Sequence, residues 1–142
     1  MNMKTLGVVH SVYKNRVQAP RQGGTIAEIE VSEKYEEGLK DMETFSHLHV
    51  FYWLHQSKGF TLSVKTHWDS KPHGLFATRS PDRPNPLGYS VVRLVERKGN
   101  ILKVEGLDAI EGTKIIDIKP YIPRIDLKHK ANSGWLERMT GC

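Results

Sequence analysis

The stretch "GYSVVRLVERKGNILKVEGL" (residues 88–107) has the pattern of two β-strands joined by a tight turn. Both arms are rich in β-branched residues, and the Gly-Asn pair between them is typical of a hairpin. Further runs of the same kind occupy residues 6–13, 25–31, 47–55, 60–68, 74–79 and 114–122. Eight short strands with short turns predict an all-β fold. We expect one mostly antiparallel sheet closed into a β-barrel, because closure removes exposed strand edges.

Helical signals are few and short. Residues 32–43 read as a helix that Ser32 can cap, and residues 132–139 are expected to add one more turn. Because strands do not alternate with helices, a doubly wound parallel sheet is excluded. The length of 142 residues suits one domain, so we expect a single domain over 1–142, with a barrel core of about residues 5 to 125 and a tail over 126–142.

The composition is that of an ordinary soluble protein, with 38% hydrophobic and 26% charged residues. No apolar run is long enough to span a membrane, and the first residues lack the apolar region of a signal peptide. The single cysteine is Cys142, which leaves no internal disulfide or cysteine metal cluster. A cytoplasmic location is therefore expected. The net charge of +5, with basic residues concentrated in the second half, is compatible with nucleic acid binding.

Three prolines stiffen the segment "ATRSPDRPNP" (77–86), which carries two arginines, Arg79 and Arg83. Proline fixes φ and supplies no backbone donor, so this loop can form neither a helix nor a central strand. A guanidinium on a rigid mount suits carboxylates and phosphates. The segment, called the arginine loop below, is either an anion-binding loop or a rigid connector with solvated arginines.

Histidines raise the possibility of a metal site. Alternation places His47, His49 and His55 on one face of the strand 47–55, and His-x-His on a strand can supply two metal ligands. His55 lies roughly 20 Å from His49 along an extended strand, and no carboxylate is spaced to complete a local site. We expect no metal and interpret these side chains as core or ligand-stacking histidines.

A second polar cluster lies in "DIKPYIP" (117–123). Asp117, Lys119 and Tyr121 alternate onto one face at a strand end, where prolines break the pairing. A carboxylate, an ammonium and a phenol on one face could carry out proton transfer. The alternative is a salt bridge at the end of a strand.

Longer motifs give a family resemblance. The segments "HGLFATRSPDRPNPLGYSVVRL" (73–94) and "GLDAIEGTKIIDIKPYIP" (106–123), together with "PRQGG" (20–24), resemble the TsaA/TrmO family over about residues 5 to 125. The resemblance implies a β-barrel methyltransferase that uses S-adenosylmethionine and forms a homodimer with cofactor sites near the subunit interface. It also implies tRNA as the substrate, methylated on the exocyclic nitrogen of threonylcarbamoyladenosine beside the anticodon. The chain lacks the C-terminal extension of the longer bacterial members.

The same resemblance implies a set of cofactor contacts. They are Pro20, Arg21, Gln22, His55, Gln56, Arg79, Leu87, Leu107, Asp108, Ala109 and Ile110. The last four would read the adenine edge through backbone groups, and an arginine suits the cofactor's carboxylate. In this interpretation the arginine loop presents Arg79 to the cofactor, while Arg83 holds the loop against a neighbouring subunit or the RNA backbone.

For the reaction itself we expect Asp117 to act as the base, with Tyr121 orienting it and Lys119 stabilising developing charge or holding a phosphate. Positioning supplies most of the catalysis of such an in-line methyl transfer. Two other functions are kept open. One is a non-catalytic module that binds S-adenosylmethionine or RNA for regulation, and the other is a methyltransferase that acts on a small molecule.

Overall fold

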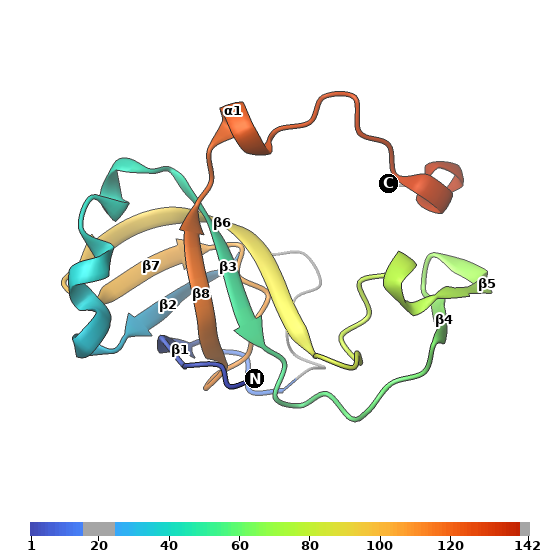
Figure 1. Cartoon of the computed structure of the whole chain (residues 1–142), viewed down its shortest axis with the longest axis horizontal. Coiled ribbons are helices and arrows are strands. Elements are labelled where there is room, and N and C mark those ends of the chain that lie inside the picture. The colour runs from blue at the N-terminus through green and yellow to red at the C-terminus, as the bar shows by residue number, and fades with distance from the viewer. Residues whose placement is uncertain (16–24, 140–142) are drawn as a thin grey trace. The chain divides into compact units, whose positions relative to one another are not determined.

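The computed structural model describes residues 1–15 and 25–139. Six strands form a closed barrel in the order β1-β2-β7-β6-β3-β8 (Figure 1). Their bounds are β1 Gly7–His10, β2 Ile26–Val31, β3 His47–Trp53, β6 Leu87–Lys98, β7 Ile101–Glu105 and β8 Lys114–Pro120. Every neighbouring pair in the barrel is antiparallel, which confirms the predicted all-β barrel.

Side chains alternate between the inside and the outside of the barrel along its strands, and the inward ones fill the interior. In β3 the side chains of Leu48, Val50 and Tyr52 are buried, while His47, His49, Phe51 and Trp53 are only partly covered. Side chains of Ile29, Leu102, Val104 and Ile115 from the other strands complete the interior and are fully buried. The same alternation confirms the prediction that His47 and His49 share the outer face with Phe51.

One end of the barrel depends on a glycine. Gly88 on β6 pairs with Tyr52 on β3, and the Tyr52 ring lies directly over it. A Cβ atom at position 88 would overlap that ring. The absence of a side chain on Gly88 therefore lets Tyr52 turn inward and fill the end of the barrel.

The chain divides into two compact units. The barrel unit contains Met1–Gln56 and Pro86–Tyr121, and the second unit contains Ser57–Asn85 and Ile122–Cys142. In the second unit, β4 (Ser63–Thr66) and β5 (Asp69–Gly74) pair as an antiparallel hairpin separate from the barrel. Two of the eight predicted strands are thus not barrel strands. The expectation of a single domain over 1–142 stays a prediction.

The segment around Trp135 contacts this hairpin and the turn that follows it. Trp135, in the 3₁₀ turn η4 (Gly134–Arg138), stacks on His73 with ring centroids 3.8 Å apart. Its indole N–H donates to the carbonyl of Ala77 at 2.8 Å, and His73 in turn pairs with Asp69 at 2.9 Å. The short helix α1 (Pro123–Asp126) belongs to the same unit.

Two local predictions differ from the structure. Residues 74–79 do not form a strand: Leu75–Ala77 is a 3₁₀ turn, η3, whose Leu75 carbonyl accepts from the backbone N–H and the hydroxyl of Thr78. Residues 32–43 are two 3₁₀ turns, η1 (Glu33–Leu39) and η2 (Met42–Thr44), because Asp41 between them has a positive φ of 70°. A residue in that left-handed conformation ends a helix. No helix among residues 1–15 and 25–139 is both long and apolar enough to cross a membrane.

Candidate functional site

Several predicted contacts meet where β3 ends and β6 begins. Trp53 pairs with Leu87, and the N–H of Leu54 donates to the carbonyl of Pro86 at 2.8 Å. His55 and Gln56 follow directly along the chain, and His55 is exposed to solvent. The structure therefore places His55 and Gln56 at the same end of the barrel as Leu87.

The segment 107–110 lies at that end as well, between β7 and β8. Leu107, Ala109 and Ile110 are almost fully buried, with 2%, 4% and 7% of their surface exposed. Among the described residues, hydrogen bonds reach this segment only at the carbonyls of Asp108 and Ile110. The backbone N–H groups of 107–110 have no acceptor within residues 1–15 and 25–139, an arrangement that suits recognition of a flat heteroaromatic edge between apolar side chains.

Tyr52 connects this segment to the barrel strands. Its hydroxyl donates to the Asp108 carbonyl at 3.1 Å and accepts from the Ser90 hydroxyl at 2.9 Å. Burial raises the pKa of the Tyr52 hydroxyl, so the group stays a donor at neutral pH. Burial also raises the pKa of the Asp108 carboxyl above its ordinary value. Tyr52 thus fixes the backbone that we expect to contact the cofactor.

The same region includes both flanks of the "PRQGG" motif. Pro20, Arg21 and Gln22 lie outside the described residues. On either side of them, the hydroxyls of Tyr13 and Thr25 are hydrogen-bonded at 2.9 Å. The N–H of Gly106 donates to the Thr25 carbonyl, and the N–H of Glu111 donates to the Tyr13 carbonyl. Both flanks of the motif are therefore tied to the residues that bracket 107–110.

The two arginines of the arginine loop have different environments within the second unit. Arg83 is half-buried, and its Nη1 atom donates to the carbonyls of Thr78 and Ser80 at 3.0 Å and approaches that of Leu75 at 3.5 Å. Its guanidinium also lies 5.8 Å from the ring centre of Phe76. Arg79 is exposed and has no partner among the described residues. Arg83 thus holds the loop against its own chain, and Arg79 is the arginine that a ligand can reach.

The predicted proton-transfer cluster is on the outer face of β8. Lys119 Nζ lies 3.7 Å from Asp117 Oδ2, and both side chains are about half exposed. Asp117 Oδ1 accepts from the N–H of Ile118 at 2.9 Å. Tyr121 packs instead against His49, with ring centroids 5.2 Å apart. The structure therefore brings Asp117 and Lys119 together as an ion pair and directs Tyr121 to the histidines.

Aromatic side chains cover the adjoining outer face of β3 and β6. His49 stacks on Tyr89 at 5.7 Å and its Nδ1 atom is hydrogen-bonded to the Tyr89 hydroxyl at 2.8 Å. Phe51 lies 5.3 Å from Tyr89 on the same face. His47 and His49 thus lie on the outer face rather than in the core, His55 lies beyond the end of β3, and stacking of these rings on a ligand stays a prediction. The described ranges contain no cluster of three or more His, Cys, Asp or Glu side chains that could hold a metal ion.

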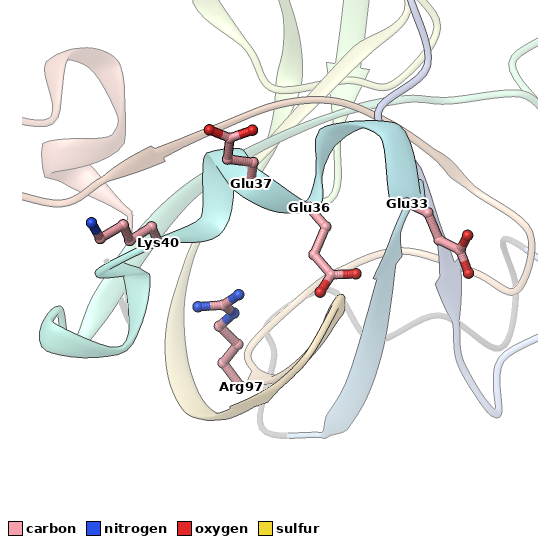
Figure 2. Close-up of a pocket in the computed structure, with 5 residues that line it drawn as sticks. All are labelled: Glu33, Glu36, Glu37, Lys40 and Arg97. Atoms are coloured by element: carbon pink, nitrogen blue, oxygen red, sulfur yellow. The ribbon is translucent and has the colours of Figure 1, made fainter.

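A shallow depression elsewhere on the barrel unit has a different lining, shown in Figure 2. It is lined by Glu33, Glu36, Glu37, Lys40 and Arg97. Arg97 donates to the Gly99 carbonyl at 2.9 Å and to Glu43 at 3.3 Å. None of the predicted site residues lines this depression. Its arginine, Arg97, is already hydrogen-bonded to other groups of the chain.

Sequence reasoning missed the residues that support the site. Gly88 and Ser90 lie within the quoted segment 73–94 but were not singled out, Tyr52 lies in none of the quoted motifs, and Tyr13 and Thr25 only flank one. A usable signal existed at position 52, because a tyrosine at an inward position of a strand must find a partner for its hydroxyl. The identity of that partner depends on tertiary folding.

Comparison with known proteins gives concordant matches. The family model for the tRNA-methyltransferase O N-terminal domain matches residues 8–127. A probable S-adenosyl-L-methionine-binding protein from Archaeoglobus fulgidus is 49% identical, over 96% of this chain and 38% of the relative. The tRNA (adenine(37)-N6)-methyltransferase of Escherichia coli is 36% identical, over 83% of this chain and 56% of the relative. The crystal structure of TrmO from Pseudomonas aeruginosa has a TM-score of 0.80 at 30% identity, covering 94% of this chain and 61% of that one.

Proposed function

The chain belongs to the tRNA-methyltransferase O N-terminal domain family, and from that premise we propose that it binds S-adenosylmethionine and methylates an adenine nitrogen of tRNA. The chain spans only 38%, 56% and 61% of the lengths of the three proteins compared above, so the activity of the whole protein is a proposal. The observation that carries it is the 107–110 segment, whose N–H groups have no acceptor among the described residues and whose side chains at 107, 109 and 110 are buried and apolar.

The donor set of the barrel end fits this cofactor. The N–H groups of residues 107–110 suit the adenine edge, and Leu107, Ala109 and Ile110 supply an apolar slot. His55, Gln56 and Leu87 border the same end, as do the flanks of the segment that contains Pro20, Arg21 and Gln22. We keep Arg79 of the second unit as the proposed partner of the cofactor's carboxylate, because its guanidinium is exposed and has no partner among the described residues. When bound, the cofactor supplies a methyl group on an electrophilic sulfonium.

We further propose that Asp117 accepts a proton from the substrate nitrogen. Its half-exposed carboxylate is accessible from solvent, and Lys119 beside it can stabilise developing charge or hold a phosphate. Tyr121 orients this pair in the proposal, although its ring packs on His49 rather than on Asp117. The alternative is that Asp117 serves only as the partner of Lys119.

The proposed substrate is threonylcarbamoyladenosine beside the anticodon. An unmodified exocyclic amine of adenine is a poor nucleophile because its lone pair is delocalised into the ring. A carbamoyl group makes the remaining N–H more acidic, so that a carboxylate can accept its proton. The name of the E. coli relative, a tRNA (adenine(37)-N6)-methyltransferase, supports this substrate class.

Replacing Arg79 tests the cofactor site. Arg79→Ala is expected to weaken binding of S-adenosylmethionine by about 1.5–3 kcal/mol, the scale of a charged hydrogen bond. Titration calorimetry measures this directly, with Arg138→Ala as the control because Arg138 is another exposed arginine of the second unit. Parent affinity in Arg79→Ala would remove this residue from the site, and no binding by the parent would refute the proposed function.

A homodimer is also proposed, through the outer face of β3 and β6. Leu87, Tyr89 and Val91 on this face are each 40% exposed. An exposed apolar face of this kind suits a second copy of the chain. Light scattering at micromolar concentration should give the mass of two chains, and a monomer mass would contradict the proposal. The cytoplasmic location stays a prediction.

A further inference from the structure

The charge of the molecule is concentrated in the second unit. That unit contains nine lysines and arginines and four aspartates and glutamates, which gives it the whole net charge of +5. The barrel unit contains twelve residues of each sign and is neutral. A small unit with such an excess of positive charge attracts polyanions.

Almost all of these cations are accessible. Eight of the nine are exposed, namely Lys58, Lys65, Lys71, Arg79, Arg124, Lys128, Lys130 and Arg138. Among the described residues, none of the eight forms an ion pair with a carboxylate, although Lys71 interacts electrostatically with Asp69, the carboxylate that pairs with His73. The barrel unit differs, because Arg93, Arg97, Lys98 and Lys119 each pair with a carboxylate at 3.1–3.7 Å. Unpaired surface cations can neutralise phosphates without breaking an existing pair.

Exposed apolar rings accompany the cations. Phe60 is 50% exposed and Phe76 is 74% exposed, and Leu62 between them along the chain is 65% exposed. Lys58 and Lys65 lie within a few residues of Phe60, and Phe76 immediately precedes the arginine loop. Cations interleaved with exposed aromatic rings are the composition of single-stranded nucleic acid sites, in which bases stack on the rings.

The unit is also held in shape by its own contacts. Arg83 binds carbonyls of the arginine loop, and Trp135 closes on the hairpin through His73 and Ala77. Ser57 and the N–H of Lys58 both donate to the carboxylate of Asp82, which fixes the start of the unit to the loop. A surface that is already ordered loses less entropy when it binds a partner.

We propose that the second unit is the RNA-binding surface of this chain, with its unpaired cations contacting phosphates and Phe60 and Phe76 stacking on unpaired bases. This inference rests on the proposed function, since it assigns the tRNA substrate to one unit.

Matched charge removal in the two units tests the proposal. Lys58, Lys65 and Lys71 are changed together to Gln in the full chain, and Lys34, Lys40 and Lys103 of the barrel unit are changed together as the control. Both variants lose three exposed positive charges, so a general effect of net charge is the same in each. Fluorescence anisotropy with labelled bulk tRNA at several salt concentrations gives the affinity and its salt dependence, and calorimetry gives the affinity for S-adenosylmethionine.

The second-unit variant is expected to lose about tenfold or more in tRNA affinity, with the slope of log K against log salt reduced by roughly one per lysine that contacts a phosphate. The barrel variant should retain the slope of the parent. An equal loss in both variants, or an unchanged slope in the second-unit variant, would overturn the proposal. Retained binding of S-adenosylmethionine in all three proteins separates this outcome from failure of the proposed function, in which the parent itself would not bind the cofactor.

The rings are tested by Phe76→Leu, which removes the aromatic face and keeps an apolar side chain. Loss of a stacked base should weaken tRNA binding by about 5- to 100-fold and leave the salt slope unchanged. Parent affinity in Phe76→Leu and in Phe60→Leu would overturn the stacking assignment. A change of oligomeric mass in either variant, with tRNA binding retained, would instead assign these rings to a contact between copies.

Discussion

The barrel unit and the second unit differ in net charge and in how many of their surface cations form ion pairs. In the barrel unit, acids and bases are equal in number and four cations are paired with carboxylates. In the second unit the cations outnumber the acids and stand unpaired in the described residues. The barrel keeps its distinctive groups at one end, as backbone donors and a buried tyrosine. This difference supports the proposal that the second unit binds tRNA, whereas all of the proposed cofactor contacts except Arg79 belong to the barrel unit.

The largest expected effect separates chemistry from binding. Asp117→Asn keeps the shape of the side chain but removes a base, so the rate of methyl transfer to tRNA should fall by about 10²- to 10⁴-fold. The affinities for tRNA and S-adenosylmethionine should stay near those of the parent, because asparagine keeps the shape of the side chain and Asp117 is not one of the proposed binding contacts. Single-turnover kinetics measure the rate.

A normal rate in Asp117→Asn, together with a small loss of thermal stability, would contradict the catalytic role. That outcome is expected if Asp117 serves only as the partner of Lys119, since an exposed ion pair of this kind contributes about 1 kcal/mol or less. The thermal midpoint of the same variant therefore distinguishes the two interpretations.

A smaller effect is expected from removing one hydroxyl group in the barrel. Tyr52→Phe keeps the ring over Gly88 but releases the Asp108 carbonyl, so affinity for S-adenosylmethionine should fall by about 1 kcal/mol. Tyr35→Phe is the control, because Tyr35 packs against the core from η1 without a hydrogen bond to 107–110. Calorimetry that finds the same affinity in Tyr52→Phe and Tyr35→Phe would show that the 107–110 backbone does not depend on Tyr52.

The smallest expected effect is a pH-dependent contribution of His10, in the barrel unit, to the free energy of unfolding. A hydrogen bond from His10 to Glu30 at 2.8 Å, with Glu111 3.5 Å away, raises the pKa of His10 above 6.5. Because the folded state binds this proton more tightly, the stabilisation is complete below pH 6.5 and is lost as pH rises through the raised pKa. The side chain is 44% exposed, so solvent screening keeps the contribution below about 1 kcal/mol.

Urea unfolding at pH 5.5 and pH 8.5 measures this contribution. The difference in unfolding free energy between the parent and His10→Asn should shrink at the higher pH, whereas His129→Asn, a change at an exposed histidine of the second unit, should follow the parent at both. An equal difference at both pH values would show that His10 does not act through its charge.

Periodicity predicted most of the barrel but not the second unit. The strand runs 25–31, 47–55 and 101–110 contain β2, β3 and β7, because inward positions alternate with outward ones wherever one face is buried. The prediction of a strand over residues 74–79 is wrong. Their composition is typical of a strand, but hydrogen bonds from Thr78 and Arg83 to the Leu75 carbonyl stabilise a 3₁₀ turn there. The strand β5 (Asp69–Gly74) carries a proline and little apolar periodicity, so its pairing with β4 (Ser63–Thr66) depends on tertiary contacts.

The residues of the candidate site also fall into two groups, those that the sequence identified and those that only the structure reveals. Family motifs identified His55, Gln56, Leu87 and residues 107–110, and the structure brings these to one end of the barrel. The supporting hydroxyls of Tyr52 and Ser90 could not be found from the sequence, because their hydrogen bonds join residues 38 and 56 positions apart. The contacts of Arg83 within its own loop could not be predicted for a related reason. Every residue has a backbone carbonyl, so the sequence does not indicate which carbonyls a guanidinium will bind.

The most direct measurement is single-turnover incubation of the full chain with methyl-labelled S-adenosylmethionine and bulk tRNA, followed by digestion and separation of the nucleosides. The label is expected in the nucleoside derived from threonylcarbamoyladenosine and absent from unmodified adenosine. Tight binding of S-adenosylmethionine with no label in tRNA would contradict the account, and would point to a binding module or to a small-molecule substrate instead.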